Sequence, residues 1–278
     1  MHNLNPCDKD AFSLYQKAVE RKHSGQSKNR LQAAGKDVKS YYEEYERLYH
    51  AGTLNSIRPK RISGPLFNDL YELYDYNAAV VKEVQESIKK NNPATVYGIC
   101  QYCGLVSHDT MDHILPHKKY AEYSIHAKNL IPCCTDCNRR KNESELLNLY
   151  TDALPNVEYL FMDVAPDGDT IDLTFRLDNT ANEVDTALFS KIENHYAKLA
   201  LFDRMKMKAN AQLPCFLIQI GRQYDKFGKN DVIETVMENN SELRRVYGYN
   251  YWEAAFQKGL VNSPVFWDYY EKGLLNKQ

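Results

Sequence analysis

The sequence predicts an α+β protein that is mainly helical, with a small cysteine-bearing module near its centre. Apolar residues recur at helical spacing through the first third of the chain and again from about residue 183 onward. Between these parts, two β-rich runs flank a Pro-Asp-Gly-Asp turn signal, which indicates a short hairpin. The central module is marked by two C-x-x-C pairs, Cys100/Cys103 and Cys134/Cys137.

Composition narrows the class of protein. A chain of 278 residues with 43% hydrophobic and 26% charged residues is typical of a soluble globular protein with one large core or two modest ones. No apolar run approaches the roughly 20 residues that a membrane-spanning helix needs, and the first ten residues lack the apolar stretch of a signal peptide. We therefore expect a cytoplasmic protein with no membrane segment. Seven cysteines, four of them in C-x-x-C pairs, fit metal binding in a reducing compartment better than a disulfide framework.

Periodicity predicts three helices before the module, around residues 12–19, 41–49 and 66–88. Gly64-Pro65 marks the start of the third helix, and Asn91-Asn92-Pro93 marks its end. The tyrosines in these stretches are better explained as core residues than as ligand contacts.

Changes in periodicity and the helix- and strand-breaking residues divide the chain into three regions: helical residues 1–93, the module at 94–147, and residues 148–278. In the last region, 157–164 and 170–177 read as strands of the hairpin, and helices follow.

Charge is unevenly distributed along the chain. The net charge of −2 argues against a protein that coats nucleic acid indiscriminately. The first 150 residues hold 21 Lys and Arg against 18 Asp and Glu, whereas the remainder holds 14 against 19. The basic residues cluster in four segments that could line a phosphate track: Lys17–Lys39, Arg58–Arg61, Lys118-Lys119 and Arg139–Lys141. For the first cluster a solvated helix face is the better explanation, whereas the last adjoins the candidate site, so we expect Arg140 and Lys141 to bind phosphate.

The two cysteine pairs predict a zinc site. Thirty residues separate them, and four thiolates complete a tetrahedral shell that leaves no open position for water, so the zinc is structural. Cys133 also lies one helical turn before Cys137. We favour Cys134 as the ligand, because it completes the C-x-x-C spacing, and interpret Cys133 as a small buried residue.

Because the zinc has no open position for water, a catalytic site in this module would use a second metal ion. Asp112 offers a carboxylate oxygen and Asn138 an amide oxygen, which suit Mg²⁺ or Mn²⁺. His113 is the candidate general base, because its ordinary pKa lies near neutrality. Asp112 and His113 are adjacent, and the side chains of adjacent strand residues point to opposite faces. The two can serve one site only if the strand bends or splays there, which Pro116 shortly afterwards permits. Asn129 could hold either the histidine ring or the connecting loop.

Each of these residues also has a simpler explanation when taken alone. Asp112 would be a turn or cap residue and Asn129 a loop residue. Three further histidines surround the motif: His108, His117 and His126. Taken alone, each is better explained as a polar surface residue than as a catalytic one. Their combination is the stronger evidence for a functional site, because both cysteine pairs, Asp112-His113 and the two asparagines all lie within 42 residues.

The pattern resembles the zinc-bearing branch of the HNH endonucleases, the ββα-metal nucleases. It consists of the two cysteine pairs with Asp112-His113, Pro116, Asn129-Leu130, Asn138 and Lys141 between or after them. The resemblance implies strands at Thr110–Leu115 and Asn129–Cys133 and a helix at Thr135–Leu147. It also implies that His113 activates water, that Asp112 and Asn138 hold one divalent ion, and that Asn129 positions the base. Asparagine at Asn138, in place of the family's last histidine, is a variant of active members.

The stretch Thr110–Ile125 also resembles stand-alone bacterial HNH proteins of ATPase-associated anti-phage systems of the Septu type, with departures at His117 and Ala121. This similarity implies a nuclease that cleaves DNA, or alternatively RNA, to leave a 5′ phosphate, and an ATPase partner. Two rivals remain: a non-catalytic zinc module that binds nucleic acid or protein, and a subunit that is silent without its partner. The aromatic-rich C-terminal region suits a docking surface, but a core is the better explanation.

Overall fold

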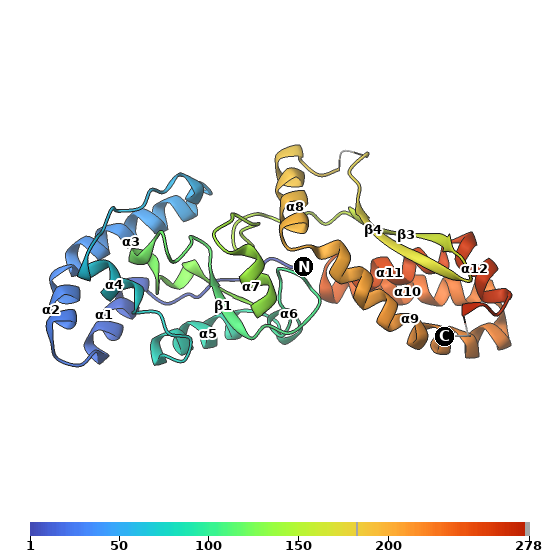
Figure 1. Cartoon of the computed structure of the whole chain (residues 1–278), viewed down its shortest axis with the longest axis horizontal. Helices are drawn as coiled ribbons and strands as arrows, with labels where there is room; N and C mark the ends of the chain where they lie inside the picture. Colours follow the sequence, from blue (N-terminus) through green and yellow to red (C-terminus); the bar gives the residue numbers. More distant parts are fainter. Residues whose placement is uncertain (182, 276–278) are drawn as a thin grey trace. The chain divides into compact units, whose positions relative to one another are not determined.

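The computed structural model describes residues 1–181 and 183–275 (Figure 1). The chain forms two compact units. The N-terminal unit comprises Asn3–Gln101 and Val106–Leu154, and the C-terminal unit comprises Met1–His2, Tyr102–Leu105 and Pro155–Gln278. The first two predicted regions thus fall mainly in one unit. Across the described residues, no helix is both long and apolar enough to cross a membrane.

Six α-helices and a short 3₁₀ turn precede the first cysteine pair in the N-terminal unit. They are α1 (Ala11–Arg21), α2 (Gln26–Ala33), α3 (Gly35–His50), the turn Leu54–Ser56, α4 (Pro65–Tyr71), α5 (Ala79–Asn91) and α6 (Ala94–Tyr97). α1 begins where the Asp10 side chain accepts a hydrogen bond from the backbone N–H of Ser13, and α4 begins with proline in its first turn, where no backbone donor is needed.

The single helix predicted over 66–88 is wrong in its middle. The start at Pro65 and the end at Asn91 are confirmed, but α4 stops at Tyr71 and α5 begins only at Ala79. Between them the Asp75 side chain accepts a hydrogen bond from Asn77 N at 2.8 Å, and the Asp75 carbonyl accepts one from Ala78 N at 2.9 Å. An aspartate that bonds to its own backbone two residues on competes with the helix, so the apolar stripe continues across a turn.

The module itself is a ββα unit. β1 (Thr110–His113) pairs antiparallel with β2 (Leu130–Cys133), with His113 opposite Leu130, and α7 (Thr135–Lys141) follows. β1 is shorter than predicted, because the next two backbone N–H groups bond to the carbonyl and side chain of Asn129. α7 is also shorter than predicted: it ends at Lys141, since Asn142 adopts a left-handed φ of 51°.

One hydrophobic core unites the helices with the loop between β1 and β2. Tyr42 and Tyr45 of α3 are buried, as the sequence predicts, and their rings pack against Tyr123 and His126 of that loop. The core continues through α1, α2 and α5 and reaches Met111 in β1. The N-terminal helices therefore form the wall against which the module folds.

Over its described residues, the C-terminal unit is a hairpin with five helices. They are β3 (Leu160–Asp167), β4 (Thr170–Leu177), α8 (Thr186–Lys198), α9 (Leu201–Phe227), α10 (Lys229–Tyr247), α11 (Trp252–Val261) and α12 (Pro264–Glu271). The turn is tighter than predicted, because Pro166 lies within β3 opposite Ile171 and only Gly168-Asp169 connect the strands. Trp252, Phe266 and Trp267 are buried, so these aromatics are core residues.

Candidate active site and metal centre

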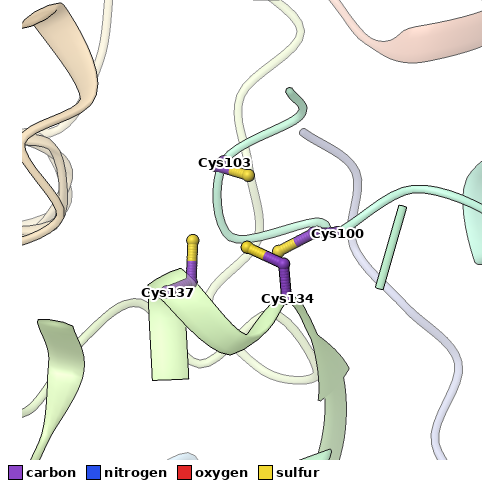
Figure 2. A group of neighbouring side chains, drawn as sticks. All are labelled: Cys100, Cys103, Cys134 and Cys137. Carbon is purple, nitrogen blue, oxygen red and sulfur yellow. The ribbon is translucent and has the colours of Figure 1, made fainter. Parts of the chain in front are cut away.

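The four cysteines of the two C-x-x-C pairs come together. Cys100 and Cys103 lie on the loop before β1, Cys134 is the residue before α7, and Cys137 lies in its first turn (Figure 2). All four are buried, and their sulfur atoms lie within 4.8 Å of one another. A zinc–sulfur bond of about 2.3 Å places tetrahedral sulfurs about 3.8 Å apart, so the donor set fits one zinc ion. Cys133 is outside the group, which favours Cys134 as the fourth ligand.

Short-range contacts shape this centre. The Cys100 backbone N–H donates to the Val106 carbonyl at 2.8 Å, which closes the loop, and Gly104 takes a left-handed φ of 67° behind the second cysteine. The Asp109 carboxylate accepts from Thr135 N at 2.6 Å at the start of α7. Asp109 is a residue that the sequence pattern did not single out.

His113 lies at the end of β1, with 7% of its surface exposed. Its Nε2 lies 2.9 Å from the carbonyl oxygen of Ser124. A carbonyl only accepts hydrogen bonds, so Nε2 carries the proton and Nδ1 carries the lone pair. The ring stacks on His117, with centroids 4.4 Å apart, and meets the Tyr74 ring edge-on at 4.5 Å.

Burial dominates the electrostatics of the two stacked histidines. Burial, with the nearby His117 and Lys141, lowers the pKa of His113 to about 3, although the Ser124 carbonyl acts in the opposite direction. Burial also lowers the pKa of His117 to about 4. The His113 imidazole is therefore neutral near pH 7, which is the form that can accept a proton.

The segment around α4 fixes these rings. The Ser124 hydroxyl donates to the Leu70 carbonyl at 2.6 Å, and His117 Nε2 donates to the Tyr71 carbonyl at 2.9 Å. The Tyr74 hydroxyl donates to the Met111 carbonyl at 3.2 Å. Sequence reasoning missed these contacts, since the partners lie some 40 residues apart in the chain.

Asp112 and its neighbours on α7 form the other side of the site. Asp112 is 4% exposed, and its two carboxylate oxygens lie 2.9 and 3.2 Å from Lys141 Nζ. Lys141 also donates to the His113 carbonyl at 2.6 Å. Asn138, one turn earlier on α7, donates through Nδ2 to the Met111 carbonyl at 3.4 Å. One face of α7 therefore lies along β1, and Asp112 faces α7 while His113 faces the α4 segment.

The oxygen donors suit a divalent cation. Mg²⁺ is commonly held by one or two protein oxygen ligands, with water and substrate phosphate completing its shell, and Asp112 and Asn138 would supply a carboxylate and an amide oxygen. Lys141 differs from the sequence expectation. It is 2% exposed and ion-paired, so in this arrangement it neutralises Asp112 rather than presenting its charge to phosphate. Arg140 is less buried and pairs with Asp136 at 3.1 Å.

Asn129 is fully buried and holds the loop that follows β1. Its side-chain oxygen accepts from Leu115 N at 2.7 Å, and its side-chain nitrogen donates to the Tyr123 carbonyl at 3.0 Å. The Tyr45 hydroxyl donates to the same oxygen at 3.4 Å. Of the two roles that the sequence left open, these bonds favour positioning of the connecting loop.

The remaining histidines of the module differ from one another. The surface interpretation is wrong for His126, which is fully buried among tyrosine rings and 3.6 Å from a Glu46 oxygen. His117 is part of the stack described above. His108 is half-buried beside Tyr97.

Comparison with known proteins bears directly on this module. Residues 100–144 match the family model described as HNH endonuclease. No curated protein and no solved structure matches the chain. The matched span starts at the first cysteine of the metal centre and includes β1, β2 and α7. Over residues 100–144 the chain is therefore similar to the HNH endonucleases.

Proposed function

We propose that the protein is a metal-dependent endonuclease that hydrolyses DNA phosphodiester bonds, with His113 as the general base. The observation that carries this proposal is the state of the His113 ring: Nε2 donates to the Ser124 carbonyl, so the lone pair is on Nδ1. The ring is held between His117 and Tyr74, and Asp112 precedes it in the strand.

The chemistry follows from these positions. His113 Nδ1 accepts a proton from the attacking water, whose oxygen bonds to phosphorus as the bond from phosphorus to the 3′ oxygen breaks. The products are a 5′ phosphate and a 3′ hydroxyl. A divalent cation held by Asp112 and Asn138 would stabilise negative charge on the phosphate and the leaving oxygen. Asn129 keeps the loop after β1 in place, and the four-cysteine zinc supports the fold.

The rival function, a zinc module that only binds nucleic acid or protein, is less well supported. Burying Asp112 with Lys141 removes two charges from water, which costs several kcal/mol per ion before their attraction offsets it. A binding module has no need of a buried carboxylate beside a neutral, oriented histidine, whereas a nuclease needs both.

The metal requirement tests the proposal. Wild-type protein is expected to nick supercoiled plasmid in Mg²⁺ or Mn²⁺, and Asp112→Ala and Asn138→Ala are expected to need a higher metal concentration or to fail. Asp136→Ala is the control, because this acid lies on the same helix and pairs with the exposed Arg139 and the partly exposed Arg140. The proposal fails if plasmid cleavage is absent in both metals, with and without the ATPase partner that the sequence resemblance implies. It also fails if cleavage is indifferent to Asp112.

We further propose that the nuclease is the effector of an anti-phage system and that an ATPase is its partner. The support is the resemblance of the segment Thr110–Ile125, together with a net charge of −2, which gives the chain little general attraction to DNA. Co-purification from the native host tests this, and an isolated chain that degrades plasmid rapidly and is toxic alone would contradict it.

A further inference from the structure

Two basic segments of the N-terminal unit lie side by side. The first follows the 3₁₀ turn and carries Arg58 and Arg61, and the second follows His113 in the β1–β2 loop and carries Lys118 and Lys119. These four residues, called here the basic surface, are all exposed. Within the described residues none of the four forms an ion pair. Exposed cations without an ion-pair partner are available to a polyanion.

Several contacts join the two segments. The Tyr120 hydroxyl donates to the Ile57 carbonyl at 3.4 Å, and the Lys60 backbone N–H donates to a Glu122 carboxylate oxygen at 3.0 Å. The Lys119 ammonium lies 5.5 Å from the centre of the Tyr120 ring. Burial raises the pKa of Tyr120, and the nearby Arg58 partly offsets that effect. Charges from both segments therefore gather around Tyr120.

The basic surface adjoins the general base. His117, which directly precedes Lys118, is partly exposed and stacks on the His113 ring at 4.4 Å. The chain thus passes from the base through the stacked histidine to two exposed lysines. A phosphate chain that meets Lys118 and Lys119 would run past the catalytic side chain.

Few acids lie near the basic surface, although the exposed Glu145 lies close enough to Tyr120 to help raise the pKa of that tyrosine. Residues 57–66 contain no acid, and Glu122, the first acid after His113, is 2% exposed and bonded to Lys60 N. Glu44 pairs with Lys60, which removes that lysine from the set. Arg61 has a left-handed φ of 53°, a strained conformation for a residue other than glycine that is frequent at functional sites.

By contrast, the arginines of α7 are engaged locally. Arg139 and Arg140 both bond to the Asp136 carboxylate, at 3.0 and 3.1 Å. Their positive charge is therefore partly neutralised by a neighbour on the same helix. The basic surface is the stronger candidate for contact with phosphate.

We propose that Arg58, Arg61, Lys118 and Lys119 bind the DNA backbone beside the scissile bond and so deliver the phosphate to His113. This inference rests on the proposed nuclease function and adds the surface that holds its substrate. Contacts to phosphate alone carry no sequence information, so this surface positions DNA without selecting a sequence.

Fluorescence anisotropy with a labelled DNA duplex tests the proposal, with full-length proteins that also carry His113→Ala to prevent cleavage. Each phosphate contact that is lost lowers the magnitude of the slope of log K against log salt by about 1. Replacing all four residues of the basic surface with alanine is expected to lower it by about 3 to 4 and to weaken binding at least tenfold at low salt. The matched control removes the same charge from four other exposed lysines of this unit: Lys36, Lys82, Lys89 and Lys90.

Equal slopes and affinities for the two quadruple variants would overturn the proposal, as would the absence of binding by the parent protein at low salt. Cleavage measured with the same substitutions in chains that retain His113 separates this outcome from the nuclease proposal. Cleavage that needs His113 but ignores the basic surface would sink this inference alone. Binding that depends on the surface, with no cleavage in any metal, would leave the surface standing and remove the nuclease.

Discussion

At the scale of single residues, the ion pair between Asp112 and Lys141 determines the electrostatics of the site. Both side chains are nearly inaccessible to solvent, and the lysine donates to the carboxylate and to the His113 carbonyl. Such pairs are costly to bury but very costly to break, since the remaining charge has no partner. Lys141 therefore acts as a counter-charge for the carboxylate that would hold the divalent ion.

Replacing this lysine is expected to be strongly destabilising. Lys141→Gln leaves Asp112 buried without its partner and should lower the free energy of unfolding by about 3–5 kcal/mol, with partial recovery in Mg²⁺. Arg140→Gln, on the same helix but less buried, should cost less than about 1 kcal/mol. Thermal and urea unfolding of both variants gives the answer; similar losses would show that the buried pair contributes little.

The zinc assignment distinguishes two adjacent thiols. Cys134→Ser should reduce zinc content and solubility, because a metal-stapled module depends on the ion for its fold. Cys133→Ser should keep one zinc per chain, because Cys133 lies outside the four-sulfur group. Elemental analysis of the two purified variants checks this, and the reverse pattern would assign the ligand to Cys133.

How far the sequence predicts the site depends on how local each feature is. The four cysteines of the candidate zinc site and Asp112-His113 are encoded by short spacings, so the cysteine group could be identified without a structure. The ion pair between Lys141 and Asp112 and the hydrogen bond from Ser124 to Leu70 could not be predicted in this way, because they depend on how α7 and α4 pack on the strands.

At the scale of elements, α4 and the turn after it hold in place the ring of His113, the proposed general base. Tyr71 stacks on His117 with ring centroids 3.9 Å apart, and Tyr74 contacts both His113 and His117. The apolar periodicity predicted a helix here but not its break, since a local aspartate turn interrupts the stripe without changing its spacing. That break separates the Tyr71–Tyr74 segment from α5.

The Tyr74 ring is expected to matter more than its hydroxyl. Tyr74→Ala removes the edge contact with His113 and should lower the cleavage rate at least tenfold with zinc retained. Tyr74→Phe keeps the ring and loses one hydrogen bond, worth about 1 kcal/mol. Single-turnover rates of the two variants decide the point; equal rates would mean that Tyr74 does not position the base.

At the scale of the whole molecule, the two units differ in how well the sequence predicts them. The hairpin and the helical character of the C-terminal region follow from turn signals and periodicity, with errors of a few residues at the ends of the first strand, although the bounds of the individual helices were not predicted. The N-terminal unit is less predictable, because its helices and the ββα module share one core built from contacts distant in sequence. We therefore interpret the N-terminal helices as one folding unit with the ββα module rather than as a separate attachment.

Acid should weaken the fold through buried histidines. Burial lowers the pKa of His195 from 6.5 to about 4, so between these values the unfolded chain binds a proton that the folded chain does not. Stability is thus complete above pH 6.5 and falls as the pH drops, by roughly 2 kcal/mol at pH 5. His195→Gln should reduce the loss between pH 7.5 and pH 5, whereas the exposed control His23→Gln should not. Unfolding curves at the two pH values measure it, and an unchanged loss in His195→Gln would contradict the assignment.

The central claim is that His113 performs the chemistry within a zinc-supported HNH domain. The most direct test compares metal-dependent plasmid cleavage by wild type, His113→Ala and the control His108→Ala, with the partner protein present if the wild type needs it. We predict that His113→Ala loses at least 100-fold in rate while retaining one zinc per chain and its thermal stability, and that His108→Ala cleaves like wild type. A folded, zinc-loaded His113→Ala protein that cleaves at the wild-type rate would contradict the account.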